Sequence, residues 1–202
     1  MSVAAALPEP GPIPGPDQVD DIDALASRLD AATYEERLAW IRSLNGAQMT
    51  RLFQRCAGRP LTLDDLLRGD DGPVVCEGKN GLAMFNRFAK IFARVDGTYV
   101  GYNRNGFVQR VFAGDGHFVA YDATRSTDGA PGEIVIDYRV IPVRTHDSFP
   151  TLRRNDRPIG PMLVFAWMYD LLRRVSEDVF IGDSFRRLPG GAPFILVRPP
   201  TP

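Results

Sequence analysis

The chain has 202 residues, of which 44% are hydrophobic and 24% charged, and its formal net charge is −1. This length and composition are typical of one large globular domain, with or without a small appendage, that buries a sizeable core. A net charge close to zero excludes a global field that would attract nucleic acid or anionic lipid, so we expect neither as a partner.

The charge is unevenly distributed along the chain. Residues 1–30 carry six acids and one base, which leaves a balance of +4 for the remaining residues. The bases are arginines except for Lys79 and Lys90. A GC-rich genome explains this usage most simply, and an arginine-rich site for phosphate or carboxylate is the alternative. Cys56 and Cys76 have no cysteine or histidine at metal-ligand spacing, so we expect no disulfide and no metal site.

The N-terminus predicts no signal peptide, because residues 1–16 lack basic residues and contain five prolines. The longest apolar stretch, PMLVFAWMYDLL, is short for a bilayer span and is interrupted by Asp170. We therefore expect a cytoplasmic protein. Motifs for nucleotide binding are absent, and no cofactor is expected.

The chain reads as a proline-rich disordered or extended tail at 1–16, a helical cap subdomain at 17–69 and a strand-rich region at 70–202. Apolar residues recur at helical spacing in the subdomain, and TYEE at 33–36 and TLDD at 62–65 are capping patterns. We expect the pair NG at 45–46 to end the second helix. A helical subdomain in this position would cover one mouth of a barrel.

Short apolar runs separated by Gly, Asn and Asp follow from residue 70 onward, with VDGT and NRNG as hairpin signals. The segments 82–95 and 162–175 fit either a helix or strands. Seven to nine short strands without helices between them predict a mainly β fold with an N-terminal helical segment, built as an antiparallel sandwich or barrel.

The closing segment, MYDLLRRVSEDVFIGDSF at 168–185 followed by APFILVRP, resembles that of small bacterial lipocalin-like (calycin) proteins, and in particular the uncharacterised GXWXG-type family. The GXWXG signature itself is absent, and EGKNG stands at 77–81. The resemblance implies an antiparallel lipocalin-like barrel that holds a small, mostly apolar molecule. Proteins of this kind include carriers and cofactor-free cyclases and isomerases, and the resemblance transfers no catalytic residues.

Tyrosine side chains suit a ligand cavity, because each combines a large apolar surface with one polar tip. We expect ligand contacts from five residues of the strand-rich region: Tyr99, Tyr102, Tyr121, Asp137 and Trp167. The alternatives are ordinary packing for the aromatic residues and a solvated outer face for Glu133, Asp137 and Arg139.

Three residues are candidates for catalysis. Asp170 would be an inward carboxylate with a raised pKa if its segment is a strand, and half of an ordinary surface pair with Arg174 if the segment is a helix. Tyr138 could donate a proton to a developing oxyanion. His146, beside Asp147, could act as a general acid or base. His117, at the start of a strand, is expected to be exposed.

The expected function is binding of a small, mostly apolar molecule in a barrel cavity. In its enzymatic form the protein would be a cofactor-independent cyclase or isomerase of a polyketide-like intermediate, which needs few titratable groups. The alternatives are a non-catalytic carrier or sensor, and a protein-interaction module whose barrel is solid. The sequence does not specify the ligand or the oligomeric state.

Overall fold

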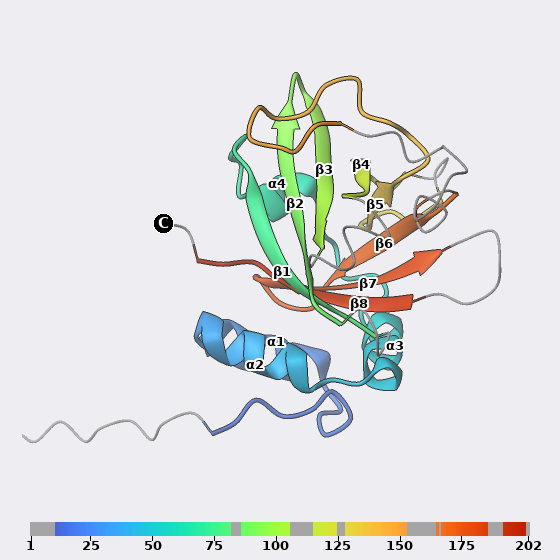
Figure 1. Ribbon diagram of the computed structural model, residues 1–202. Helices are drawn as coiled ribbons and strands as arrows, with labels where there is room; N and C mark the ends of the chain where they lie inside the picture. The colour runs from blue at the N-terminus through green and yellow to red at the C-terminus, as the bar shows by residue number, and fades with distance from the viewer. Residues whose placement is uncertain are drawn as a thin grey trace, which may run out of the picture.

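The computed structural model describes residues 11–81, 86–105, 115–124, 128–152, 165, 167–185 and 192–200, and shows a barrel with helices on its outside (Figure 1). The expected strand at 107–113 and the arginine-rich loop at 153–161 lie outside these residues.

Four helices precede the strands in the described part of the chain: α1 (Ile22–Ala31), α2 (Tyr34–Ser43), α3 (Gly46–Arg55) and α4 (Leu63–Leu67). Thr33 and Thr62 form the predicted capping boxes of α2 and α4. Asn45 caps the start of α3 with Gln48, so it begins the third helix rather than simply ending the second.

In the described ranges eight antiparallel strands follow, and each pairs with the next of them. They are β1 (Val74–Asn80), β2 (Phe88–Val95), β3 (Thr98–Asn105), β4 (His117–Asp122), β5 (Ile134–Asp137), β6 (Tyr169–Arg174), β7 (Val179–Phe185) and β8 (Ala192–Val197). Pairing of β1 with β8 closes the barrel, which removes the exposed sheet edges. The predicted mainly β fold is confirmed, and the described parts of both ambiguous segments contain strands, β2 and β6.

The helices α1, α2 and α3 do not cover a mouth of the barrel as the sequence suggested. Figure 1 shows them along the outer wall, where α2 and α3 contact β8. Leucines and Trp40 of the helices form a core with the outward apolar residues of β6 to β8, such as Ile181 and Ile195. Outward residues of these strands are apolar because the helices shield them from water.

The short helix α4 closes one end of the barrel instead. Its leucines Leu63, Leu66 and Leu67 pack with inward residues such as Phe92 and Phe180. Polar bonds tie α4 to the strand ends around it, because Asp64 pairs with Arg94 and Asp65 pairs with Arg174. We call this the closed end.

The opposite end of the barrel is where β1, β3, β5 and β7 finish. We call it the far end. Side chains alternate across each strand, so every second residue points inward. Close to the far end the inward positions include Lys90, Asn103 and Asp170, whereas towards α4 they are mostly hydrocarbon.

Candidate functional site

Four polar side chains meet inside the barrel near the far end, and we call them the polar layer: Lys90, Asn103, Tyr138 and Asp170. Lys90 Nζ lies 2.9 Å from Asp170 Oδ2 and 2.9 Å from Asn103 Oδ1, and it also donates to Tyr138 Oη. Tyr138 Oη lies 2.8 Å from Asn103 Nδ2 and 3.3 Å from Asp170 Oδ2. Each of the four is at most 4% exposed.

The strand register explains why these residues meet. Lys90 of β2 pairs directly with Asn103 of β3, and Asp170 of β6 enters from across the barrel. Tyr138 follows the last residue of β5 and continues its inward face. A closed barrel is therefore needed to bring Lys90 and Asp170, 80 residues apart in sequence, into contact.

Aromatic rings surround the ammonium group of Lys90. Its Nζ lies 4.8 to 5.6 Å from the ring centroids of Phe88, Phe118, Tyr138 and Phe194. Such distances allow cation–π attraction, which is strongest where the cation has lost its water.

Glycines make room for three of these rings. A methyl group placed on Gly78, Gly101 or Gly182 would lie 2.8, 2.3 or 2.2 Å from the nearest ring atom of Phe88, Phe118 or Phe194, respectively. Each phenylalanine therefore occupies the space that a side chain on the neighbouring strand would need. We refer to the three phenylalanines as the aromatic cage.

Burial controls the titration of the polar layer. It lowers the pKa of Lys90 because an ammonium group loses its hydration, although the Asp170 carboxylate opposes this change. Burial, and then the nearby Asp170 charge, raise the pKa of Tyr138 well above its usual value. The lysine is therefore shifted towards its neutral form, and the phenol keeps its proton at neutral pH.

One carboxylate oxygen of the polar layer is unsatisfied. Asp170 Oδ1 is buried and accepts no hydrogen bond from the residues that the structure describes, while Oδ2 accepts from Lys90. Leaving a buried acceptor without a donor costs about 1–3 kcal/mol, and more for a charged group. The polar layer is thus one hydrogen-bond donor short.

Two of the predicted catalytic residues, Asp170 and Tyr138, lie together in this layer. The segment of Asp170 is a strand, and the carboxylate points inward as predicted for that case. The third, His146, lies in the segment after β5, where its Nδ1 is 2.9 Å from Ser148 Oγ and its ring packs against Phe149. Phe149 belongs to the outer-wall cluster, so His146 is not part of the polar layer.

The predicted ligand-binding tyrosines are separated by the fold. Tyr99 points inward at the closed end, where its hydroxyl donates to Asp64 of α4 at 2.6 Å. Tyr102 lies on the outer wall, with its ring 4.9 Å from that of Phe149. Tyr121 also lies outside, and its hydroxyl donates to Asp137. None of the three contacts the polar layer through a described bond.

The remaining expectations concern residues away from the interior. Asp137 forms an ion pair with Arg139 on the outer wall, and Trp167 is 61% exposed with a left-handed backbone (φ 60°). The side chain of Asp137 points outward, as in the alternative given for it, but its carboxylate is buried rather than solvated and is bonded to Arg139 and Tyr121. Glu133, only 3% exposed, is buried in the same way, with an ion pair to Arg173.

His117 is buried, contrary to the prediction that it would be exposed. It begins β4, and its ring lies 5.9 Å from the ring of Tyr102 on the outer wall. Burial lowers its pKa, which favours the neutral imidazole.

Sequence reasoning missed Lys90 and Asn103 as members of the site. A signal was present in FAKIF, because strand alternation places Lys90 on the same face as Phe88 and Phe92. A lysine between two inward phenylalanines is unusual, since lysine is almost never fully buried without a partner. This signal depends on strand alternation, and the sequence left open whether 82–95 is a helix or a strand.

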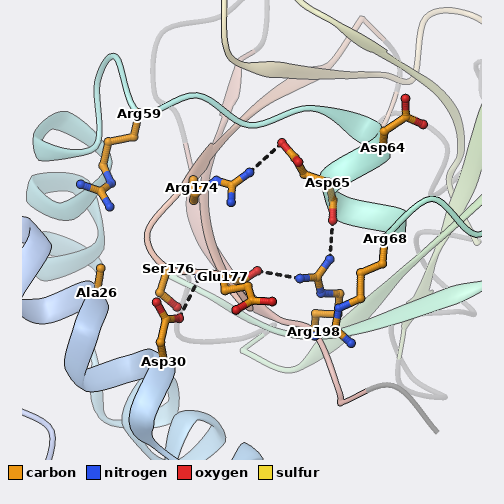
Figure 2. Close-up of a pocket in the computed structure, with 10 residues that line it drawn as sticks. All are labelled: Ala26, Asp30, Arg59, Asp64, Asp65, Arg68, Arg174, Ser176, Glu177 and Arg198. Atoms are coloured by element: carbon orange, nitrogen blue, oxygen red, sulfur yellow. Dashed lines mark hydrogen bonds and ion pairs between the residues drawn. The ribbon is translucent and has the colours of Figure 1, made fainter.

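A second candidate is an open pocket of about 610 Å³ outside the barrel, between α1, α4 and the turn from β6 to β7 (Figure 2). Four arginines line it: Arg59, Arg68, Arg174 and Arg198. Each of them is bonded to a carboxylate of the chain itself: Asp23, Asp178, Asp65 and Asp178, respectively. These arginines therefore hold α1, α4 and the strands together, and we do not assign a ligand to the pocket.

Comparisons of the chain with protein families, with curated proteins and with solved structures find no match. The closed eight-stranded antiparallel barrel is consistent with a lipocalin-like fold. In the described ranges, no helix is long and apolar enough to cross a bilayer, and no three His, Cys, Asp or Glu residues are grouped to hold a metal ion.

Proposed function

We propose that the protein binds a small, mostly apolar molecule at the polar layer, and that this molecule donates a hydrogen bond to Asp170 Oδ1. The proposal rests on Asp170 Oδ1, which is buried in an aromatic environment and has no hydrogen-bond donor among the described residues. Buried polar groups are nearly always satisfied, and a bound ligand is one way to satisfy them. The aromatic cage would contact the apolar body of the ligand.

The rest of the interior limits where the ligand can lie. Towards α4 the barrel is filled by packed side chains such as Phe92, Phe180 and Leu172. This packing favours the alternative of a solid barrel for that half of the molecule. A solid barrel does not account for the polar layer, because a buried ion pair rarely adds stability over apolar residues of similar volume. The ligand is therefore placed at the far end.

Phe165 is the side chain that the ligand would displace. It comes from the connection between β5 and β6, is 5% exposed and stacks on Tyr138 with ring centroids 5.0 Å apart. Its ring also occupies the space beside Gly116, where a methyl group would lie 2.7 Å away. Phe165 thus packs against the polar layer through Tyr138.

The test uses N-phenyl-1-naphthylamine, a fluorescent probe with an apolar aromatic body and a single N–H donor. We expect saturable binding to the wild-type chain. Phe165→Ala should bind more tightly, because the ligand no longer has to displace the ring. Phe149→Ala is the matched control, since it removes a phenylalanine of the same connection that packs on the outer wall, and it should bind like wild type.

A second pair of variants locates the hydrogen bond. Asp170→Asn should weaken binding of the probe by about tenfold, which corresponds to about 1.4 kcal/mol for one hydrogen bond. Asp183→Asn, an outward carboxylate on the next strand, should leave binding unchanged. The proposal fails if wild type and Phe165→Ala do not bind the probe, or if both asparagine variants behave alike.

A catalytic form of this function is the second candidate, favoured by the 3.3 Å between Tyr138 Oη and Asp170 Oδ2. A phenol that keeps its proton beside a carboxylate can polarise a carbonyl group while the carboxylate moves a proton. Cyclohex-3-enone would then be converted into its conjugated isomer, with a rise in ultraviolet absorbance that Tyr138→Phe loses. Equal rates in the two proteins would exclude this candidate.

A further inference from the structure

Lys90 is one of only two lysines in the chain, and it stands at the centre of the polar layer. Its nitrogen contacts a carboxylate, a phenol and an amide oxygen, and aromatic rings enclose it. These three oxygens give each N–H donor of the ammonium group an acceptor. The combination of an amine, a proton acceptor and a proton donor is the set of groups that carbonyl condensation requires.

We propose that Lys90 forms an imine with an aldehyde or ketone that enters the far end of the barrel. This inference rests on the proposed function and names the class of its ligand as a carbonyl compound with an apolar body.

The steps balance without a further reactant. Asp170 takes a proton from the ammonium group of Lys90, and the neutral amine adds to the carbonyl carbon to give a carbinolamine. The carbinolamine hydroxyl then accepts the proton held by Asp170 and leaves as water while the nitrogen lone pair forms the C=N bond. The products are a protonated imine, the Asp170 carboxylate and one water molecule, so net charge is unchanged. Tyr138 Oη, which contacts both Lys90 and Asp170, is placed to relay the proton.

The site is suited to the product as well as to the reactant. The protonated imine carries one positive charge on the same nitrogen that carries it in the free protein. Asp170 Oδ2, 2.9 Å away, and the aromatic cage therefore stabilise the charge before and after the reaction. Burial also lowers the pKa of Lys90, which makes the neutral amine easier to reach.

Lys79 provides an internal comparison. Burial lowers its pKa as well, but its ammonium group donates to the backbone oxygens of Arg42 and Leu44. Neither a carboxylate nor a phenol bonds to it in the described structure. If imine formation depends on the polar layer and not on a lowered pKa alone, only Lys90 should react quickly.

The experiment treats the folded full-length protein with benzaldehyde and sodium cyanoborohydride, which reduces an imine to a stable benzyl amine. Peptide mapping by mass spectrometry then gives the labelling rate of each lysine and of the N-terminal amine. We expect Lys90 to be labelled at least about tenfold faster than Lys79, because the site orients the reacting groups. In urea, where the site is lost, the two lysines should be labelled at similar rates.

Variants test the groups around the amine. Lys79→Arg should leave the fast labelling intact, and Lys90→Arg should abolish it. Tyr138→Phe should slow the labelling of Lys90 without changing the labelling rate of Lys79, whereas a merely structural role would change both.

The outcomes separate this inference from the proposed function. If the probe binds but Lys90 is labelled no faster than Lys79, imine formation is wrong and ligand binding stands. If the probe fails to bind and Lys90 is not labelled, both are wrong. Fast labelling of Lys90 in the folded wild type, lost in urea, supports the inference without reliance on any variant.

Discussion

Each end of the barrel buries a carboxylate, but only one of the two carboxylates is bonded through both of its oxygens. At the closed end Asp178 accepts hydrogen bonds from Arg37, Arg68 and Arg198, and both of its oxygens are used. At the far end Asp170 is bonded through one oxygen, and no residue in the described ranges donates to the other. We attribute a stabilising role to the first set of charges, and the second set is the one on which the proposed ligand site rests.

The largest effect is expected from removing Asp178. Asp178→Ala would leave three arginines without their shared carboxylate, and breaking a buried ion pair from one side costs about 3–5 kcal/mol. Urea unfolding should show this loss. Arg144→Ala, which removes an ion pair whose side chains are 75% and 66% exposed, should change stability by less than about 0.5 kcal/mol. A small effect of Asp178→Ala would remove the contrast between the two ends.

A smaller effect is expected from filling the space beside the aromatic cage. In Gly101→Ala the new methyl group would lie 2.3 Å from the Ile91 carbonyl oxygen and 2.3 Å from the Phe118 ring, and overpacking of this kind costs about 1–3 kcal/mol. The displaced ring would also disturb the surroundings of Lys90. The free energy of unfolding measured in urea and the rate of benzaldehyde labelling should therefore both fall. A variant that changes neither would contradict the description of the aromatic cage.

The smallest effect is an acid dependence at the closed end. Burial alone would raise the pKa of Asp178, but hydrogen bonds from Arg37 and Arg198 outweigh it and lower the pKa. A carboxyl with a lowered folded-state pKa adds stability above its unfolded pKa of about 3.9, and that stability is lost as the pH falls through the folded value. The stability gap between wild type and Asp178→Asn should narrow below about pH 4. A stability difference between the two proteins that stays constant down to pH 2 would contradict the lowered pKa of Asp178.

The sequence predicted the barrel well because its signals are local. The hairpin residues VDGT, the alternating strands and the capping boxes at Thr33 and Thr62 each act within a few residues, and the structure has them in place. The second hairpin signal, NRNG, extends beyond the described residues. The position of the helices, in contrast, depends on contacts between residues that are far apart in the sequence. Outward residues such as Ile181 and Ile195 are as apolar as inward ones, and only the assembled molecule shows that helices cover them.

The candidate site was partly predictable for the same reason. Alternation placed Asp170 correctly once its segment was taken as a strand, and Lys90 could have been found from the phenylalanines on either side. Which face of a strand points inward was not predictable, so Tyr102 and Asp137 were grouped with residues of the interior although they lie on the outer wall. The contact between Lys90 and Asp170 depends on closure of the barrel, which no local pattern specifies.

The most direct test of the account is the double variant Lys90→Met, Asp170→Leu, measured for both stability and binding of N-phenyl-1-naphthylamine. Replacing a buried ion pair by apolar residues of similar volume is often neutral or stabilising by about 1–4 kcal/mol. We predict a protein at least as stable as wild type that binds the probe at least about tenfold more weakly. A variant that is less stable yet binds the probe as wild type does would show that the polar layer holds the barrel together and is not its ligand site.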